Sequence, residues 1–112
     1  MGTNRPQIAD DGEGPLRKKQ LKPFEIGATA VTNAEFEAFV SATDYVTEAE
    51  RFGWSFVFWS DVPDAIDTEA GARGAEWWRR VDGANWKDIH GPGTQSKAWF
   101  EDHPVVHVSW ND

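Results

Sequence analysis

The chain has 112 residues, a formal net charge of −8 at pH 7 and no cysteine. This length fits one domain or a piece of one. No basic run is longer than Arg17–Lys19, so we expect no nucleic-acid partner, because phosphate binding needs a concentrated basic face. Disulfides, thiolate metal sites and a cysteine nucleophile are excluded from this chain.

Membrane and secretory signals are not found in the sequence. No apolar stretch approaches the ~20 residues of a membrane helix, and residues 1–11 lack the apolar core of a signal peptide. We therefore predict no membrane partner and a cytoplasmic location. Seven Trp and seven Phe supply much of the apolar material. Large rings fill cores and also line binding surfaces; we expect most of them in the core, Trp77, Trp78 and Trp110 included.

The first third of the chain is rich in turn formers. Glycines, prolines and acidic residues in residues 1–23 predict a loop. Its acidic turn, Asp10–Glu13, lacks the alternating carboxylates and the distal Glu of an EF-hand, so we do not expect calcium there. Phe24–Ile26 alternates apolar and polar residues and predicts a short strand that ends at Gly27.

Two capping boxes predict two helices. Thr32–Glu35 combines a hydroxyl with a Glu three residues later, and apolar residues follow at i, i+3 and i+4. This pattern is typical of a helix of about ten residues with one buried face. Thr47–Glu50 repeats the box, but Gly53 should stop that helix within about a turn and a half.

The second half predicts strands separated by loops. Ser55–Trp59 is aromatic and β-branched, as in a strand. Residues 60–74 change to Asp, Pro, Ala and Gly without periodicity, which predicts a mobile loop. Gly91–Gly93 marks a turn. Residues 105–110 alternate as in a half-buried strand. Val106, Val108 and Trp110 would share one face.

The order of elements predicts a loop-dominated α+β chain. The sequence stops at Asn111 and Asp112, which are preferred helix N-caps, without a helix after them. We take this as a first indication that the domain is truncated.

No catalytic set can be argued from spacing. His103 and His107 are four residues apart, which is a metal spacing only on a helix, so structural hydrogen bonds are the better prediction for a strand. His90 lies in a loop without clustered partners. Glu48 and Glu50 are a weak acid–base pair, because capping already accounts for Glu50.

Three stretches resemble the formylglycine-generating enzyme (sulfatase-modifying factor) family. They are TEAERFGWSFVF at 47–58, WWRRVDGANW at 77–86 with the following Gly-Pro, and HPVVHVSWND at 103–112. VTNAEFEAFV at 31–40 is similar to the family segment that precedes them. The segments at 31–40 and 103–112 occur across the wider superfamily, which includes sulfoxide synthases. The two middle stretches are much more particular to formylglycine-generating enzymes.

The resemblance implies a loop-rich α+β fold, distantly similar to C-type lectins. Residues 1–112 would be the N-terminal half of that domain, truncated at both ends. It implies an oxidase that converts the cysteine of a sulfatase's CxPxR motif into Cα-formylglycine with molecular oxygen and copper(I). In the family a pair of cysteines binds copper, and thiolates suit copper(I). Those cysteines and the family's calcium ligands lie beyond the position that matches Asp112, so we expect neither cofactor in this chain and no activity from it alone.

The resemblance also implies that one wall of the substrate groove is retained at Ala49, Trp54 and Ser55. Ala49 would offer a small apolar surface near the proline of the motif, and Ser55 a hydrogen bond to the peptide. Some relatives carry acids at the positions of Ala30 and Trp54 to meet the arginine of the motif. Both acids are missing here, and Trp54 is either a partly exposed packing residue or a cation–π platform for that arginine, worth about 0.5–2 kcal/mol.

Two other classes stay open at this stage. One is a non-catalytic, lectin-like module that binds a peptide or another ligand in the aromatic groove. The other is a sulfoxide synthase that uses non-haem iron, which the stretch at 47–58 disfavours. If half of the domain is missing, apolar surface that it should cover will be exposed, especially at Val106, Val108 and Trp110.

Overall fold

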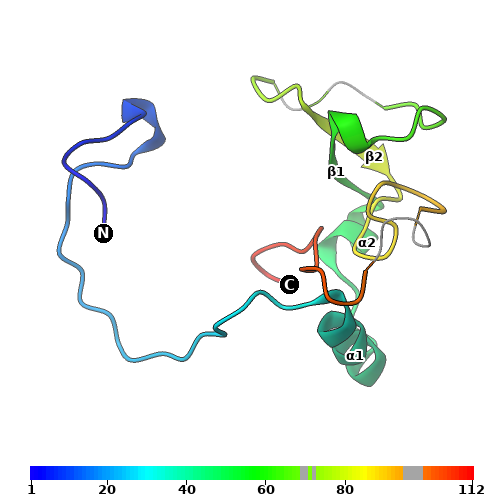
Figure 1. The fold of residues 1–112 in the computed structure, drawn as a ribbon, viewed down its shortest axis with the longest axis horizontal. Coiled ribbons are helices and arrows are strands. Elements are labelled where there is room, and N and C mark those ends of the chain that lie inside the picture. Colours follow the sequence, from blue (N-terminus) through cyan, green and yellow to red (C-terminus); the bar gives the residue numbers. More distant parts are fainter. Residues whose placement is uncertain (69–70, 72, 95–99) are drawn as a thin grey trace.

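The computed structural model describes residues 1–68, 71, 73–94 and 100–112. Short helices and one two-stranded sheet make this an α+β chain, as predicted (Figure 1). The elements in chain order are the 3-10 helix η1 (Ala9–Asp11), α1 (Asn33–Thr43), α2 (Glu48–Phe52), β1 (Trp54–Phe58), the 3-10 helix η2 (Trp59–Asp61) and β2 (Trp78–Asp82).

Both α-helices begin at the predicted capping boxes. The Thr32 hydroxyl accepts a hydrogen bond from the amide of Glu35 at 3.3 Å, and the Glu35 carboxylate accepts one from the amide of Thr32 at 2.9 Å. Thr47 and Glu50 repeat the exchange at 3.3 and 2.9 Å. Gly53 ends α2 in the left-handed conformation at φ 75°, which glycine adopts without strain. Local signals therefore determine both helices.

The sheet is an antiparallel pair that carries the core. Trp54 of β1 is the partner of Asp82, and Phe58 is the partner of Trp78, so β1 starts one residue before the predicted strand. One face is closed by a cluster of apolar side chains from the sheet and the loops around it. They are Val57, Val81 and Ala84, with Val62 and Ile66 packed against them.

A second contact joins α1 to the loop after β2. Trp86 is fully buried, and its ring meets Phe36 edge to face with the centroids 5.2 Å apart. Such pairs add about 0.5–1.5 kcal/mol to the burial of their area. Among the described tryptophans, Trp86 is therefore the one that is fully buried in the core.

Trp77 and Trp78, which we expected in the core, are 50% and 42% exposed, so that prediction was wrong for this chain. Trp78 lies at the end of a two-stranded sheet and packs edge-on against Phe58 at 5.6 Å. A sheet of only two strands offers little neighbouring surface to bury such a ring. In the described part of the chain, no further strand adjoins the sheet.

The predicted strand at Phe24–Ile26 is wrong. This segment belongs to the N-terminal arm, residues 1–29, which stands apart from the rest of the molecule (Figure 1). A strand needs a neighbour for its backbone hydrogen bonds, and among the described residues none lies beside this segment. Phe24 and Ile26 are largely exposed.

The predicted strand at Val105–Trp110 is wrong as well. Among the described residues, the isolated bridge nearest to it joins Thr32 to Pro104, the residue just before this segment. His107 has φ 57°, and this left-handed residue breaks the alternation that the sequence pattern requires. The predicted exposure is confirmed, since Val106 and Val108 are partly exposed and Trp110 is 98% exposed. The other expectation for Trp110, that its ring lies in the core, is therefore wrong.

The predicted loop at 60–74 is only partly irregular. Its first residues belong to η2, and Val62 and Ile66 pack against the core. Residues 69, 70 and 72 lie outside the described residues, and the mobility of the loop stays a prediction. The turn predicted at Gly91–Gly93 is present.

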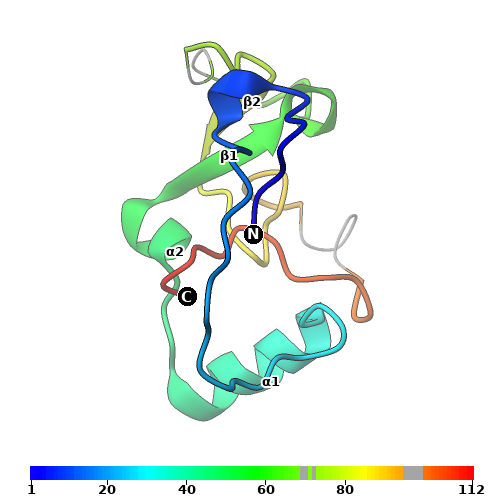
Figure 2. The ribbon, with the colours of Figure 1, turned by 90° about the vertical axis from the view of Figure 1, so that its left-hand side faces the viewer.

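The whole chain is wider than a compact domain of its length. Its radius of gyration is 17.4 Å, against roughly 13 Å for a compact chain of this size. The N-terminal arm accounts for the excess; it passes in front of the other elements in Figure 2. Met1 and Arg17 close the end of the arm on itself, with the Arg17 amide donating to the Met1 carbonyl at 2.8 Å. In the parts described, no helix has the length and apolarity to cross a bilayer.

Candidate functional site

The residues proposed for the substrate groove lie around one cavity of about 210 Å³, here called the Ala49 cavity. Three segments build it: α2, β1 and the C-terminal segment 103–112. Its lining is Glu48, Ala49, Phe52, Trp54, Ser55, Phe56, His107, Val108 and Ser109. Ala49, Trp54 and Ser55 are therefore brought together, as the resemblance implied.

Local structure explains why α2 and β1 present adjacent side chains. Gly53 turns the chain directly from the last residue of α2 into β1, and its amide donates to the Ala49 carbonyl at 2.9 Å. Ala49 and Phe52 are three residues apart, so they lie on one face of the helix. Ala49 is buried and Phe52 is exposed, which gives the cavity a small floor and an aromatic edge.

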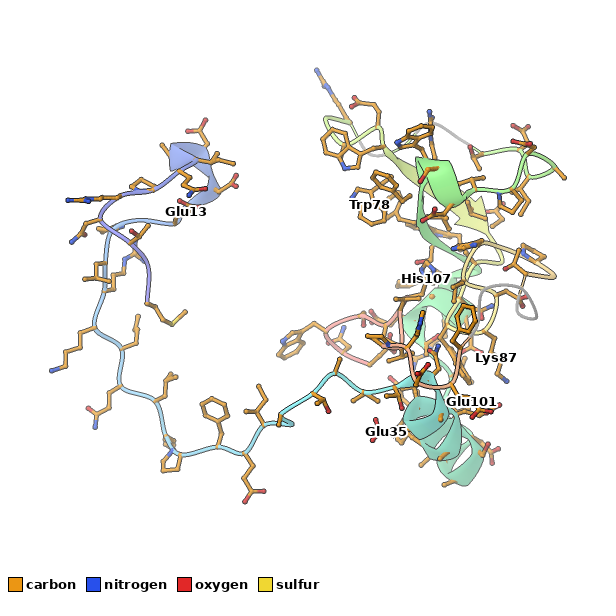
Figure 3. The ribbon with its side chains drawn as sticks, in the orientation of Figure 1. Glu13, Glu35, Trp78, Lys87, Glu101 and His107 are labelled. Atoms are coloured by element: carbon orange, nitrogen blue, oxygen red, sulfur yellow. The ribbon has the colours of Figure 1, made fainter. Side chains whose placement is uncertain are left out.

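A hydrogen-bonded chain of three groups crosses the cavity wall. Nδ1 of His107 lies 2.8 Å from the Ser55 hydroxyl, and Nε2 lies 2.8 Å from the carbonyl oxygen of Ile89. A carbonyl oxygen only accepts, so Nε2 carries a proton. In neutral His107, Nδ1 is then an acceptor and the Ser55 hydroxyl donates to it. Figure 3 shows His107 on the C-terminal segment, close to β1 and α2.

His107 is held in its neutral form. Burial lowers the pKa of its ring below the usual 6.5, the hydrogen bond to Ile89 opposes that shift, and nearby His90 lowers the pKa further. The hydrogen bonds of this residue confirm the structural role predicted for it. The sequence did not show that Ser55 is one of its partners.

The C-terminal segment is tied to the start of α2 by Asp112. Its carboxylate accepts hydrogen bonds from the Tyr45 hydroxyl at 3.0 Å, the Glu48 amide at 3.0 Å and the Ser109 amide at 2.8 Å. Burial raises the pKa of Asp112, but these hydrogen bonds outweigh burial and hold the pKa below its usual value. Glu48 in turn accepts from the Asn111 side chain at 2.9 Å. The wall that contains His107 is thereby fixed against α2.

Trp54 already has a cation on its ring. The guanidinium of Arg80 lies 4.9 Å from the ring centroid, and Phe56 meets the same ring edge-on at 5.2 Å. The half-buried ring thus packs within the chain and also lines the Ala49 cavity. Ala30 does not lie there; it lines a separate apolar cavity beside α1, of about 520 Å³, which shares Val108 with the Ala49 cavity.

A second cavity of about 330 Å³, here called the Trp78 cavity, adjoins the first. It shares Phe56 and His107 with the Ala49 cavity and is otherwise lined by Val57, Phe58, Asp61, Trp78, Ile89, His90 and Val106. Sequence reasoning missed Phe52, Phe56 and Val108 as cavity residues. Helical spacing from Ala49 was the one signal that could have indicated Phe52.

The residues present do not fit a copper(I) site. The sequence has no thiolate, the ligand type that copper(I) prefers. Across the ranges that the structure describes, no group of three or more His, Cys, Asp or Glu side chains could hold a metal ion. His90 and His107 line one cavity, whereas His103 is exposed on a different part of the segment.

The sequence is similar to several known proteins. The formylglycine-generating enzyme of Thermomonospora curvata is 52% identical over 114 residues, which cover 100% of this chain and 37% of that protein. The formylglycine-generating enzyme of Bos taurus is 47% identical over 114 residues, covering 100% of this chain and 30% of that protein. A second Bos taurus protein, the inactive C-alpha-formylglycine-generating enzyme 2, is also 47% identical, over 100% of this chain and 37% of its own length.

The chain thus spans about a third of the length of these relatives. The family model described as the sulfatase-modifying factor enzyme 1-like domain matches residues 1–112. The match extends over the whole sequence and agrees with the resemblance carried by the three stretches. The chain belongs to the sulfatase-modifying factor enzyme 1-like domain family.

Proposed function

We propose that this chain forms one wall of the substrate groove of a formylglycine-generating enzyme. In its complete form, that enzyme would oxidise the cysteine of a sulfatase's CxPxR motif to Cα-formylglycine. The observation that supports this most strongly is that Ala49, Trp54 and Ser55 line one cavity. They come from two different elements, so their meeting is a property of the fold.

The wall suits an extended peptide. Ala49 is a small apolar floor against which a proline ring can pack, and Phe52 and Phe56 add apolar edges. Ser55 supplies a polar group in the middle of this surface. A few polar groups set in an apolar pocket are the usual way to fix the orientation of a ligand.

Binding and chemistry are separate in this proposal. The residues of this chain can bind and orient the peptide, whereas the cysteines that would hold copper belong to the rest of the complete domain. The chain alone is therefore proposed to be inactive, and copper and calcium to bind only in the complete domain. The C-type-lectin-like fold of that domain, a cytoplasmic location and the lack of a nucleic-acid or membrane partner belong to the same proposal.

The arginine of the motif would not use the ring face of Trp54 that Arg80 occupies. Arg80 lies 4.9 Å from that ring, and a second guanidinium at the same place would meet a like charge. Acids at Ala30 and Trp54 are missing as well. We infer that recognition depends on the proline and backbone of the motif more than on its arginine.

A second candidate is a binding module without catalysis. It is favoured by the relative named inactive C-alpha-formylglycine-generating enzyme 2, which is as similar to this chain, at 47% identity, as the enzyme from the same organism. Both names match the same 112 residues, so identity in this region does not distinguish them.

A chimera separates the two candidates. This chain replaces the matching third of the Thermomonospora curvata enzyme, and aldehyde formation on a CxPxR peptide is measured by mass spectrometry with copper and oxygen. We expect aldehyde. Peptide binding without aldehyde, from a chimera that still binds copper, would favour the second candidate and contradict the first.

Ala49→Trp in this chimera tests the cavity itself. The large ring fills the floor of the Ala49 cavity, so KM should rise on the order of tenfold or more, which corresponds to about 1.4 kcal/mol of lost binding. Ala42→Trp is the matched control, because Ala42 is exposed on α1 and lines none of the cavities described above. Equal KM values for the two variants would refute the assignment of the groove.

A further inference from the structure

Both ring nitrogens of His107 have hydrogen-bond partners within the chain. Nδ1 faces the Ser55 hydroxyl and Nε2 faces the Ile89 carbonyl, each at 2.8 Å. Two other segments hold the ring in place, since β1 carries the Ser55 hydroxyl and the loop after β2 carries the Ile89 carbonyl, while the backbone of His107 itself has φ 57°. Neither the composition nor the resemblance assigned a role in the groove to this residue.

The direction of the hydrogen bonds follows from the Ile89 carbonyl. Because that oxygen cannot donate, Nε2 keeps its proton and neutral Nδ1 can only accept. The hydroxyl proton of Ser55 is then directed to Nδ1. Ser55 has one proton and two lone pairs, so what it has left to offer in the Ala49 cavity is an acceptor.

We propose that His107 is a positioning residue that fixes Ser55 as a hydrogen-bond acceptor for a backbone N–H of the bound peptide. This rests on the proposed function of the Ala49 cavity as a peptide groove. It also restricts the register of the peptide. Proline has no N–H, so the group that Ser55 binds belongs to a residue of the motif other than its proline.

Protonation of His107 reverses this arrangement. An imidazolium would donate from Nδ1 to the Ser55 oxygen, which occupies one of its two lone pairs and turns the hydroxyl proton toward the cavity. A peptide N–H would then compete with that proton for the remaining acceptor position, so the KM for the peptide should rise at low pH. The charged and titratable groups that share the two cavities with His107 are Glu48 of α2, Asp61 of η2 and His90 of the loop after β2. Among the described residues, no lysine or arginine lines these two cavities. Burial keeps the pKa of His107 below 6.5, so the acceptor arrangement holds at neutral pH.

Two substitutions separate the contact with Ser55 from the contact with Ile89. In His107→Gln the amide nitrogen reaches toward the Ile89 carbonyl and leaves Ser55 without its acceptor. In His107→Asn the shorter side chain places its oxygen near the position of Nδ1, where it can still accept from Ser55. Asn also tolerates the left-handed backbone at this position. His103→Gln is the control, because the His103 side chain is exposed and lines neither cavity.

The first measurement needs no peptide. The chain has three histidines, so ring ¹⁵N spectra with His107→Asn as the assignment aid identify which nitrogen of His107 is protonated. A protonated Nε2 and a bare Nδ1 at pH 7.5 are expected. A proton on Nδ1 at that pH would overturn the proposal whether or not a peptide binds.

The second measurement uses the chimera with the CxPxR peptide. His107→Gln should raise KM about tenfold, the loss of one hydrogen bond of ~1.4 kcal/mol, and leave kcat largely unchanged. His107→Asn should restore KM and remove its rise at low pH, and His103→Gln should change neither. Turnover with a KM that is unaffected by pH and by His107→Gln would overturn this inference alone. A chimera that neither binds nor turns over the peptide would overturn it together with the proposed function.

Discussion

Asp112 connects two distant parts of the chain through a single carboxylate. It accepts hydrogen bonds from the Tyr45 hydroxyl, the Glu48 amide and the Ser109 amide. All three donors prefer a charged acceptor, because hydrogen bonds to ionised groups contribute more than neutral ones. The position of the C-terminal segment, and with it His107, therefore depends on this side chain.

Asp112→Asn should destabilise the chain by about 1–2 kcal/mol, because one acceptor oxygen becomes an amide that cannot accept. The measurement is the free energy of unfolding in urea, followed by far-UV circular dichroism. Asp102→Asn removes the same charge at an exposed position just before the C-terminal segment and should leave the stability almost unchanged. Equal losses for both variants would mean that net charge, and not these hydrogen bonds, is the cause.

The site residues were only partly accessible from the sequence. Ala49, Trp54 and Ser55 lie within seven residues of each other in a stretch particular to the family, so a resemblance could identify them. Ser55 and His107 are 52 residues apart. No local sequence pattern connects residues at such a distance. The position of His107 in the cavity wall could therefore be learned only from the folded structure.

At the scale of elements, α2 is held by its N-terminal threonine. Thr47 is fully buried, its hydroxyl donates to the Glu50 carboxylate at 2.8 Å and accepts from the Glu50 amide at 3.3 Å. A helix of five residues has few hydrogen bonds of its own. Its cap is therefore a large part of what keeps Ala49 and Phe52 on one face of the cavity.

Thr47→Ala should cost about 1–2 kcal/mol, near the upper end for an N-cap, because the partner groups are left buried without the hydroxyl. Thr47→Ser keeps the hydroxyl and should lose much less. Thermal unfolding monitored by circular dichroism measures both. If the serine variant is as unstable as the alanine variant, the methyl group of Thr47 and not its cap supports the helix.

The elements that the sequence predicted correctly are those with local causes. Both helices start at capping boxes, which act over four residues, and Gly53 alone ends α2. The strands at Phe24–Ile26 and Val105–Trp110 were wrong because strands need partners from elsewhere in the chain. Alternating patterns show that a segment could pair, but not that a neighbour exists.

At the scale of the whole molecule, few side chains hold the fold together. Among the described residues, the buried apolar side chains are a small set around β1, β2 and the two α-helices, including Val57, Val81 and Trp86. Many large apolar side chains stay exposed. Each buried ring therefore accounts for a large share of the stability.

Two tryptophans form a matched pair that tests this. Trp86→Ala should destabilise the chain by about 3–5 kcal/mol through lost burial and a cavity beside Phe36. Trp110→Ala removes a ring that is 98% exposed, and should change stability by no more than about 0.5 kcal/mol. Denaturant unfolding measures both, and a loss of similar size at Trp110 would show that its ring is covered in solution.

The bridge between Thr32 and Pro104 affects the order in which parts of the chain can fold. The amides of Asn33 and Ala34, at the start of α1, donate to the carbonyls of His103 and Glu101, at 2.9 and 3.0 Å. These bonds close a loop of about seventy residues, and contacts so distant in sequence slow folding. During synthesis from the N-terminus, the amides in the first turn of α1 find these partners only after residues 101–103 have been made. Water or a chaperone then satisfies its amides until the two ends of this loop meet.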